Sequence, residues 1–118
     1  MRLMVIGSLS GQISQASKIA IKRGAQVVHA EDIEQALGAL RSGRGADIIM
    51  IDVKLDIARM VTTLETERFS IPVVACGTET DAAAAVRAIK SGAKEYIPLP
   101  PDADLIAAVL QAVTAENT

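Results

Sequence analysis

Short runs of apolar residues alternate with longer amphipathic segments along the whole chain. Each run is rich in Val, Ile or Ala, is bounded by Gly, Pro or Asp, and has the length typical of a strand. We expect strands at Leu3–Ile6, Gln26–Val28, Asp47–Ile51, Pro72–Cys76 and Glu95–Ile97. The most apolar runs show no polar alternation, which indicates strands that are buried on both faces of a sheet.

The segments between the strands carry apolar residues at helical spacing. A short polar side chain stands in front of each one, where it can cap the first turn, and glycines follow several of them. We expect helices to begin at Ser10, Asp32, Asp56, Asp81 and Asp102, the third of them running to Arg68. Strand and helix thus alternate five times. This order predicts an α/β fold of the flavodoxin-like, doubly wound type, with a five-stranded parallel sheet of order 2-1-3-4-5 and five helices.

Length and charge limit what this chain does. With 118 residues it is expected to form one domain with one core. Its 12 basic and 14 acidic residues are scattered and give a net charge of -2, so no basic stripe for nucleic acid is present. No apolar run approaches the length of a membrane span, and the single cysteine, Cys76, allows no internal disulfide. We expect a cytoplasmic protein without a bound cofactor or metal.

Ligands of doubly wound sheets bind where the carboxyl ends of the strands meet. The residues expected at that edge are Gly7, Ser8, Asp52, Val53, Gly77, Thr78, Pro98 and Leu99. Asp52 is the one charged side chain among them. The stretch MVIGSLSG after the first strand, where such proteins place phosphate or metal chemistry, has no acid.

Two stretches of the sequence resemble response-regulator receiver domains, and the likeness extends along the whole chain. IIMID places Asp52 where that family carries its phosphoaccepting aspartate. IPVVACGTETDAAAAVRAIKSGAKEYIPLPPD follows the family's fourth strand, fourth helix and fifth strand without a gap. The resemblance implies a receiver (CheY-like) fold, with Tyr96 at the position of the family's mobile aromatic residue. It does not by itself bring the function.

The resemblance also implies a phosphorylation site that is incomplete here. Gly7 and Ser8 occupy the places of the acidic pair that helps to hold Mg²⁺ in that family. Gly77 replaces the hydroxyl residue that binds the phosphoryl group, with Thr78 one place later, and Leu99 replaces the lysine. Transfer of a phosphoryl group depends on metal and cations to offset its charge, so Asp52 alone is a poor acceptor. We therefore expect a pseudo-receiver that is not an enzyme.

Further phrases resemble the FlbD-like branch of NtrC-type activators, which regulate flagellar genes with sigma-54. These phrases are GADIIMID, LDIA, PVVACG and GAKEYIPLPPDADLIAAVL. In that branch the receiver precedes an ATPase module and a helix-turn-helix domain, and it answers to a flagellar assembly protein, FliX. The resemblance thus implies a piece of a longer activator, residues 1–118 forming its regulatory domain, with a FliX-like partner.

The last third of the chain carries more apolar residues than packing on a sheet requires. The final helix has few polar breaks, and IPLPP supplies a rigid apolar loop. We expect a homodimer surface over the fourth helix, fifth strand and fifth helix, which is the usual dimer face of receivers. Its candidate residues are Ala84, Ala88, Tyr96, Leu99, Pro101, Leu105 and Val109. The alternative is that alanine is there as a good helix former that tolerates water.

Three other functions remain possible from the sequence. A conventional receiver would use Asp52 as its phosphoacceptor. A flavodoxin-like protein would bind flavin phosphate at SLSGQIS, but only Phe69 and Tyr96 are available to stack on the ring. A P-loop enzyme is disfavoured because the glycines at 7 and 11 lack the motif's spacing and its lysine.

Overall fold

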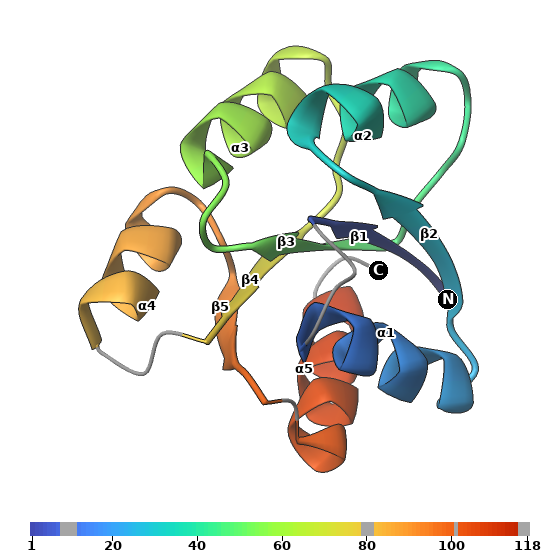
Figure 1. Cartoon of the computed structure of the whole chain (residues 1–118). Helices are drawn as coiled ribbons and strands as arrows, with labels where there is room; N and C mark the ends of the chain where they lie inside the picture. The colour runs from blue at the N-terminus through green and yellow to red at the C-terminus, as the bar shows by residue number, and fades with distance from the viewer. Residues whose placement is uncertain (8–11, 79–81, 101, 116–118) are drawn as a thin grey trace.

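Five parallel strands form one sheet in the order β2-β1-β3-β4-β5 (Figure 1). The computed structural model describes residues 1–7, 12–78, 82–100 and 102–115. The strands are β1 (Arg2–Ile6), β2 (Gln26–Ala30), β3 (Ile48–Asp52), β4 (Val73–Gly77) and β5 (Glu95–Pro98). The predicted fold class and strand order are confirmed.

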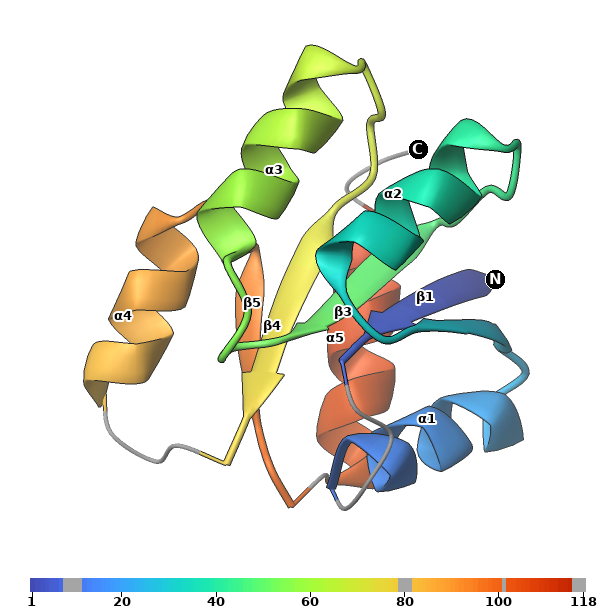
Figure 2. The same cartoon turned by 45° about the horizontal axis from the view of Figure 1, so that its top comes forward.

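Helices cover both faces of the sheet, as Figures 1 and 2 show. On one face lie α1 (Gln12–Lys22) and α5 (Ala103–Ala115); on the other lie α2 (Ile33–Arg41), α3 (Ile57–Thr66) and α4 (Ala82–Lys90). Each face has its own apolar cluster, and the side chains of β1, β3 and β4 alternate between the two. Within the described residues, no helix has the length and apolar character needed to cross a membrane.

Polar side chains at the ends of elements decide where strands and helices begin. Asp47 precedes β3 instead of opening it; its carboxylate accepts the backbone N–H of Arg2 (2.7 Å), and its own N–H donates to the carbonyl of Arg2 (2.8 Å). Asp32 caps α2 and Asp56 caps α3, each by accepting a backbone N–H in the first turn. Asp102 does the same for α5. These three predicted caps are confirmed, whereas Ser10 and Asp81 lie outside the described residues.

The end of α3 and the ends of four strands differ from the sequence-based prediction, β5 running one residue further than expected, to Pro98. The helix stops at Thr66 because Arg68 adopts a left-handed backbone with φ of 63°, which breaks the helical repeat. β3 and β4 each run one residue further than expected, to Asp52 and Gly77, and β2 extends to Ala30. Asp52 is therefore the last residue of the β3 ladder, where it pairs with Cys76.

Four residues expected on an exposed docking surface lie in the core instead. Ala84 and Ala88 are 0% and 2% exposed because α4 packs on the sheet through these small side chains. Leu99 and Val109 are also buried, and Val109 belongs to the core-facing stripe of α5 that repeats at helical spacing. The prediction that these four contact a partner is wrong. Leu105 is exposed and Tyr96 half-buried, while Pro101 lies outside the described residues.

Candidate functional site

The carboxylate of Asp52 lies at the end of β3, at the carboxyl edge of the sheet. The residue is half-buried, and its Oδ1 accepts the backbone N–H of Lys54 at 2.9 Å. Its own carbonyl accepts the N–H of Leu55 at 3.0 Å, so the loop after β3 folds back on this residue. Asp52 thus has a structural role in shaping this turn.

Gly7 follows β1 and lies directly beside Asp52. Its φ is 139°, a region that side chains other than glycine rarely adopt. A Cβ atom at this position would lie 3.0 Å from Cβ of Asp52 and 3.7 Å from its Oδ2. A side chain at residue 7, where the family pattern calls for an acid, would therefore have a strained backbone and be crowded against Asp52. Ser8 lies outside the described residues.

Gly77 ends β4 in a place that neighbouring side chains have filled. A Cβ atom here would lie 2.4 Å from Cγ1 of Val53 and 3.0 Å from the hydroxyl oxygen of Tyr96. The two side chains thus occupy the volume that a serine or threonine would need, and the Tyr96 hydroxyl lies inward over the glycine. Thr78, the next residue, is exposed.

Leu99 places an apolar side chain at the position where the receiver family has a lysine. Its side chain is 6% exposed and belongs to the apolar cluster that α1 and α5 form on their face of the sheet. Its N–H donates to the carbonyl of Gly77 (2.8 Å), and the Leu99–Pro100 peptide bond is cis. No positive side chain is supplied by this position.

The residues present do not fit a Mg²⁺ ion. This metal takes oxygen ligands in octahedral geometry and is usually held by one or two carboxylates. In the part of the chain that the structure describes, no group of three or more His, Cys, Asp or Glu side chains is placed to hold a metal ion. One oxygen of Asp52 already accepts the N–H of Lys54, and Gly7 beside it supplies no side-chain ligand.

Cys76 lies next to Asp52 in the ladder but is chemically inert. The thiol is buried, and burial followed by the negative charge of Asp52 raises its pKa to about 12. At pH 8 only about one thiol in ten thousand is then ionised. We expect Cys76 to resist iodoacetamide in the native protein and to react once urea unfolds it. Rapid alkylation under native conditions would contradict this placement.

His29 makes a contact at this edge that the sequence does not reveal. The sequence predicts only a residue at a strand end, yet the Nε2 of His29 hydrogen-bonds the carbonyl oxygen of Gly7, which follows the neighbouring strand β1. The bond joins β2 to the turn that contacts Asp52. One sequence feature could have pointed to this hydrogen bond: a histidine stands near the end of one strand, and a glycine directly follows the strand beside it.

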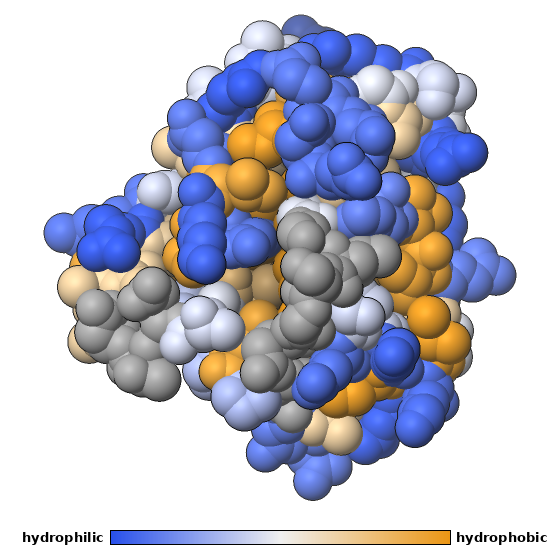
Figure 3. Space-filling view, viewed as in Figure 1, coloured by the Kyte–Doolittle hydropathy of each residue, from blue (hydrophilic) through white to orange (hydrophobic). Residues whose placement is uncertain are grey.

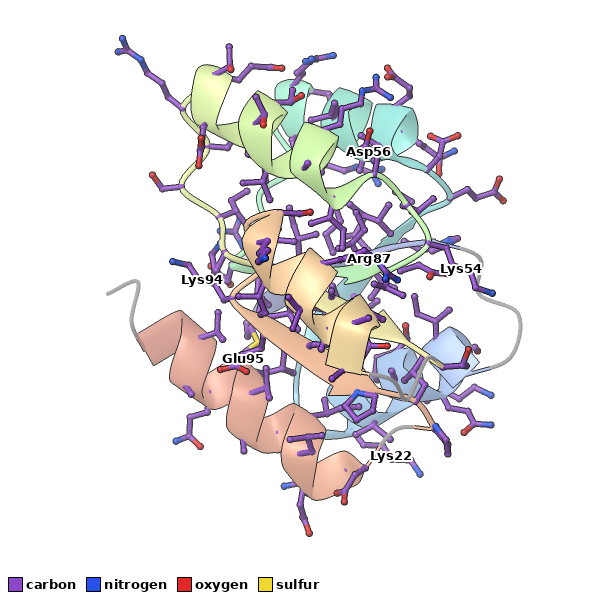
Figure 4. The ribbon with its side chains drawn as sticks, turned by 90° about the vertical axis from the view of Figure 1, so that its left-hand side faces the viewer. Lys22, Lys54, Asp56, Arg87, Lys94 and Glu95 are labelled. Carbon is purple, nitrogen blue, oxygen red and sulfur yellow. The ribbon has the colours of Figure 1, made fainter. Side chains whose placement is uncertain are left out.

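A hollow of about 190 Å³ opens next to the site, between the start of α3 and α4. Asp56 and Arg87 line it together with Val53 and Leu55, and Figure 4 shows Arg87 on the same side of the molecule as Lys54 and Asp56. Asp56 uses its Oδ1 to cap α3 by accepting the N–H of Arg59 (3.0 Å). It is committed to that structural role, as expected.

This edge of the sheet has Asp52 at the end of β3, with Gly7, Gly77 and Leu99 near it. The response regulator receiver domain family matches residues 10–111. The chain belongs to this family. As a receiver domain, it has the expected aspartate at the end of β3, while the neighbouring positions described above carry glycine or leucine.

Known relatives agree with this assignment. Over 117 residues, 99% of this chain, the sequence is 59% identical to the transcriptional regulatory protein FlbD of Caulobacter vibrioides. The match covers 26% of FlbD, so the chain spans about a quarter of that relative.

Solved structures agree in fold. The receiver domain of NtrX from Brucella abortus matches 98% of this chain and 99% of its own with a TM-score of 0.82 at 21% identity. The receiver domain of Francisella response regulator 1452 matches 99% and 98% with a TM-score of 0.77 at 20% identity.

Proposed function

We propose that this receiver domain regulates a FlbD-type transcription activator through protein contacts and not through phosphorylation of Asp52. The observation that carries the proposal is the closed surrounding of Asp52. An acid at residue 7 would be strained and crowded against Asp52, Val53 and Tyr96 fill the space above Gly77, and Leu99 is buried. The 59% identity to FlbD supports the type of regulator.

The charges around Asp52 favour signalling by protein contacts over signalling by phosphorylation. A phosphoryl group brings negative charge to a carboxylate that is already negative, and enzymes offset this charge with metal ions and cationic side chains. Here the cation position carries buried hydrocarbon, and the described residues around Asp52 offer no set of metal ligands. An aspartyl phosphate would also lack the hydroxyl and lysine contacts through which it could change the loops.

The proposed setting is a longer protein with further modules. By analogy with FlbD-like activators, an ATPase module that acts with sigma-54 and a helix-turn-helix domain follow the receiver, and a FliX-like flagellar protein is its partner. This setting rests on the resemblance in sequence and on the share of FlbD that the chain matches.

The exposed side of α4 is the proposed homodimer surface, together with β5 and α5. Val86 and Ile89 are 48% and 46% exposed, and Leu105 of α5 is 37% exposed. Figure 4 views this side, with Arg87 on α4 and Glu95 on β5. Large apolar side chains at these exposures are typical of association sites when they cluster.

Placing a charge on α4 tests this surface. Because Ile89 is exposed, Ile89→Glu should leave the fold intact and weaken self-association about tenfold, which corresponds to about 1.4 kcal/mol. Thr62→Glu, on the exposed side of α3, adds the same charge away from the surface and should change nothing. Sedimentation equilibrium of both variants makes the comparison. Equal association constants for Ile89→Glu and the parent would remove this interface.

Asp52→Asn in the full-length activator tests the proposed function. The variant removes the aspartate at the family's phosphoacceptor position while keeping the shape of the side chain, so regulated transcription should be unchanged. A conventional receiver that uses Asp52 would instead lose its response to the signal. Loss of response in Asp52→Asn protein that folds normally would favour that alternative.

A further inference from the structure

The free edge of the sheet at β2 has the chemistry of a strand-pairing surface. A strand at a sheet edge presents unpaired N–H and C=O groups, and proteins usually protect such edges with charges, prolines or a covering element. Residues 24–30, with the sequence GAQVVHA, contain no Asp, Glu, Lys, Arg or Pro. The opposite edge, β5, has Lys94 before it, begins with Glu95 and ends with Pro98.

The hydrogen bonds of β2 define which of its backbone groups point outward. The N–H of Gln26 donates to Met1 and the carbonyl of Ala30 accepts from Gly7, so the even-numbered residues face β1. Because the backbone alternates with a period of two, the N–H and C=O groups of Val27 and His29 point away from the sheet. None of these four groups has a partner in the described part of the chain.

The surroundings of this edge are apolar and open. In α1, Ile19 packs in the cluster shared with α5 and Arg23 contacts Asp104 of α5, so Ile21, on the other side of the helix, lies toward β2. Ile21 is 55% exposed, and Met1 beside the start of β2 is 45% exposed. Orange residues lie on the right-hand side of Figure 3, beside blue ones, where Figure 1 places β2.

Charge at the two ends of β2 favours a second copy of this chain as the occupant. Lys22, exposed at the end of α1, precedes the strand, and the exposed Glu31 follows it. In an antiparallel pair, the start of one strand lies beside the end of the other, so the basic end of each copy meets the acidic end of its mate. A two-fold axis through Val28 makes this arrangement self-complementary.

We propose that two copies of this domain pair through β2 in antiparallel orientation and form one continuous sheet. Val27 of each copy lies opposite His29 of the other and exchanges N–H···O=C bonds with it. Val28 meets Val28 across the axis, a β-branched pair that favours sheet formation. This surface lies at the edge opposite α4, so it is distinct from the dimer face proposed above (Figure 1).

Amide hydrogen exchange of the whole chain, measured over a range of protein concentrations, tests the pairing. We expect exchange at Val27 and His29 to slow as concentration rises toward about 1 mM, while Val28, already bonded to β1, keeps its protection. Concentration-independent exchange at Val27 and His29 would overturn the proposal. So would association that protects only α4, and so would protection that appears only when another protein is added.

Two variants separate this edge from the rest of the surface. Val28→Lys places two cations opposite each other and should weaken pairing at least about tenfold, whereas Ile89→Glu on α4 should leave the protection of Val27 and His29 unchanged. If Val28→Lys lowers the stability of the fold, Glu31→Lys is the alternative variant at the surface.

Adding Lys22→Glu to the Glu31→Lys chain should restore pairing. Glu65→Lys on α3 changes the net charge by the same amount as Glu31→Lys and should have no effect on pairing. Pairing that survives both Val28→Lys and Glu31→Lys would contradict the proposal.

Discussion

Replacing Gly77 by alanine should lower the free energy of unfolding by about 2 kcal/mol, even though only one methyl group is added. The new Cβ atom would lie 2.4 Å from Cγ1 and 3.3 Å from Cβ of Val53, so a rotation of Val53 does not relieve the contact. The Tyr96 hydroxyl, 3.0 Å away, must move as well. Urea unfolding monitored by circular dichroism measures the change.

Gly38 provides the matched control for that substitution. It lies inside α2, and nothing lies within 4 Å of the place that an added methyl group would take, so Gly38→Ala should stabilise the protein by about 0.5–1 kcal/mol. Opposite signs for the same chemical change isolate the packing around Gly77. Val53→Ala combined with Gly77→Ala should recover part of the loss. Equal effects at positions 38 and 77 would show that the space above Gly77 is open.

Restoring an acid beside Asp52 should damage the domain instead of rebuilding a metal site. Gly7→Asp must place a side chain at φ of 139° and 3.0 Å from Cβ of Asp52, and it brings two negative charges together. We expect it to cost about 3 kcal/mol of folding free energy, from backbone strain and steric overlap combined. Added Mg²⁺ should not recover this loss.

Gly24→Asp separates strain from contact. Gly24 also has a positive φ, 94°, but nothing lies within 4 Å of its Cβ position, so this variant should cost only about 1–2 kcal/mol. Thermal unfolding with and without Mg²⁺ compares the two variants. A rise in Tm of Gly7→Asp protein on adding Mg²⁺ would mean that the metal site can be rebuilt by one carboxylate.

The sequence is sufficient to predict the fold because its local signals agree with one another. Apolar runs without alternation mark β1, β3 and β4, and Asp32, Asp56 and Asp102 mark helix starts that the structure contains. β3 starts one residue later than expected, and Asp47 just before it bonds to Arg2, a contact between residues far apart in sequence. Such long-range bonds leave no local pattern.

The candidate site is only partly predictable from the sequence, because it too depends on contacts between residues far apart in the chain. The missing acid, hydroxyl and lysine positions are visible in the sequence, but the closeness of Gly7 to Asp52 and of Val53 to Gly77 depends on how loops pack. The prediction of docking residues on α4 and α5 is partly wrong. One cause is that alanine gives no signal of which face of a helix is buried. Ala84 and Ala88 face the sheet, while Val86 and Ile89 face outward.

The most direct test of the central claim is a titration of the domain with Mg²⁺ and beryllofluoride, a phosphoryl mimic, followed by amide NMR. Asp52, Val53, Lys54 and Gly77 are the reporters, since their backbone surrounds the carboxylate. Because the described residues hold no cluster of metal-ligating side chains and buried Leu99 stands in place of the family's lysine, these resonances should stay where they are. Saturable shifts at these four residues that depend on both reagents would show that the site holds metal and phosphate, and would contradict the account.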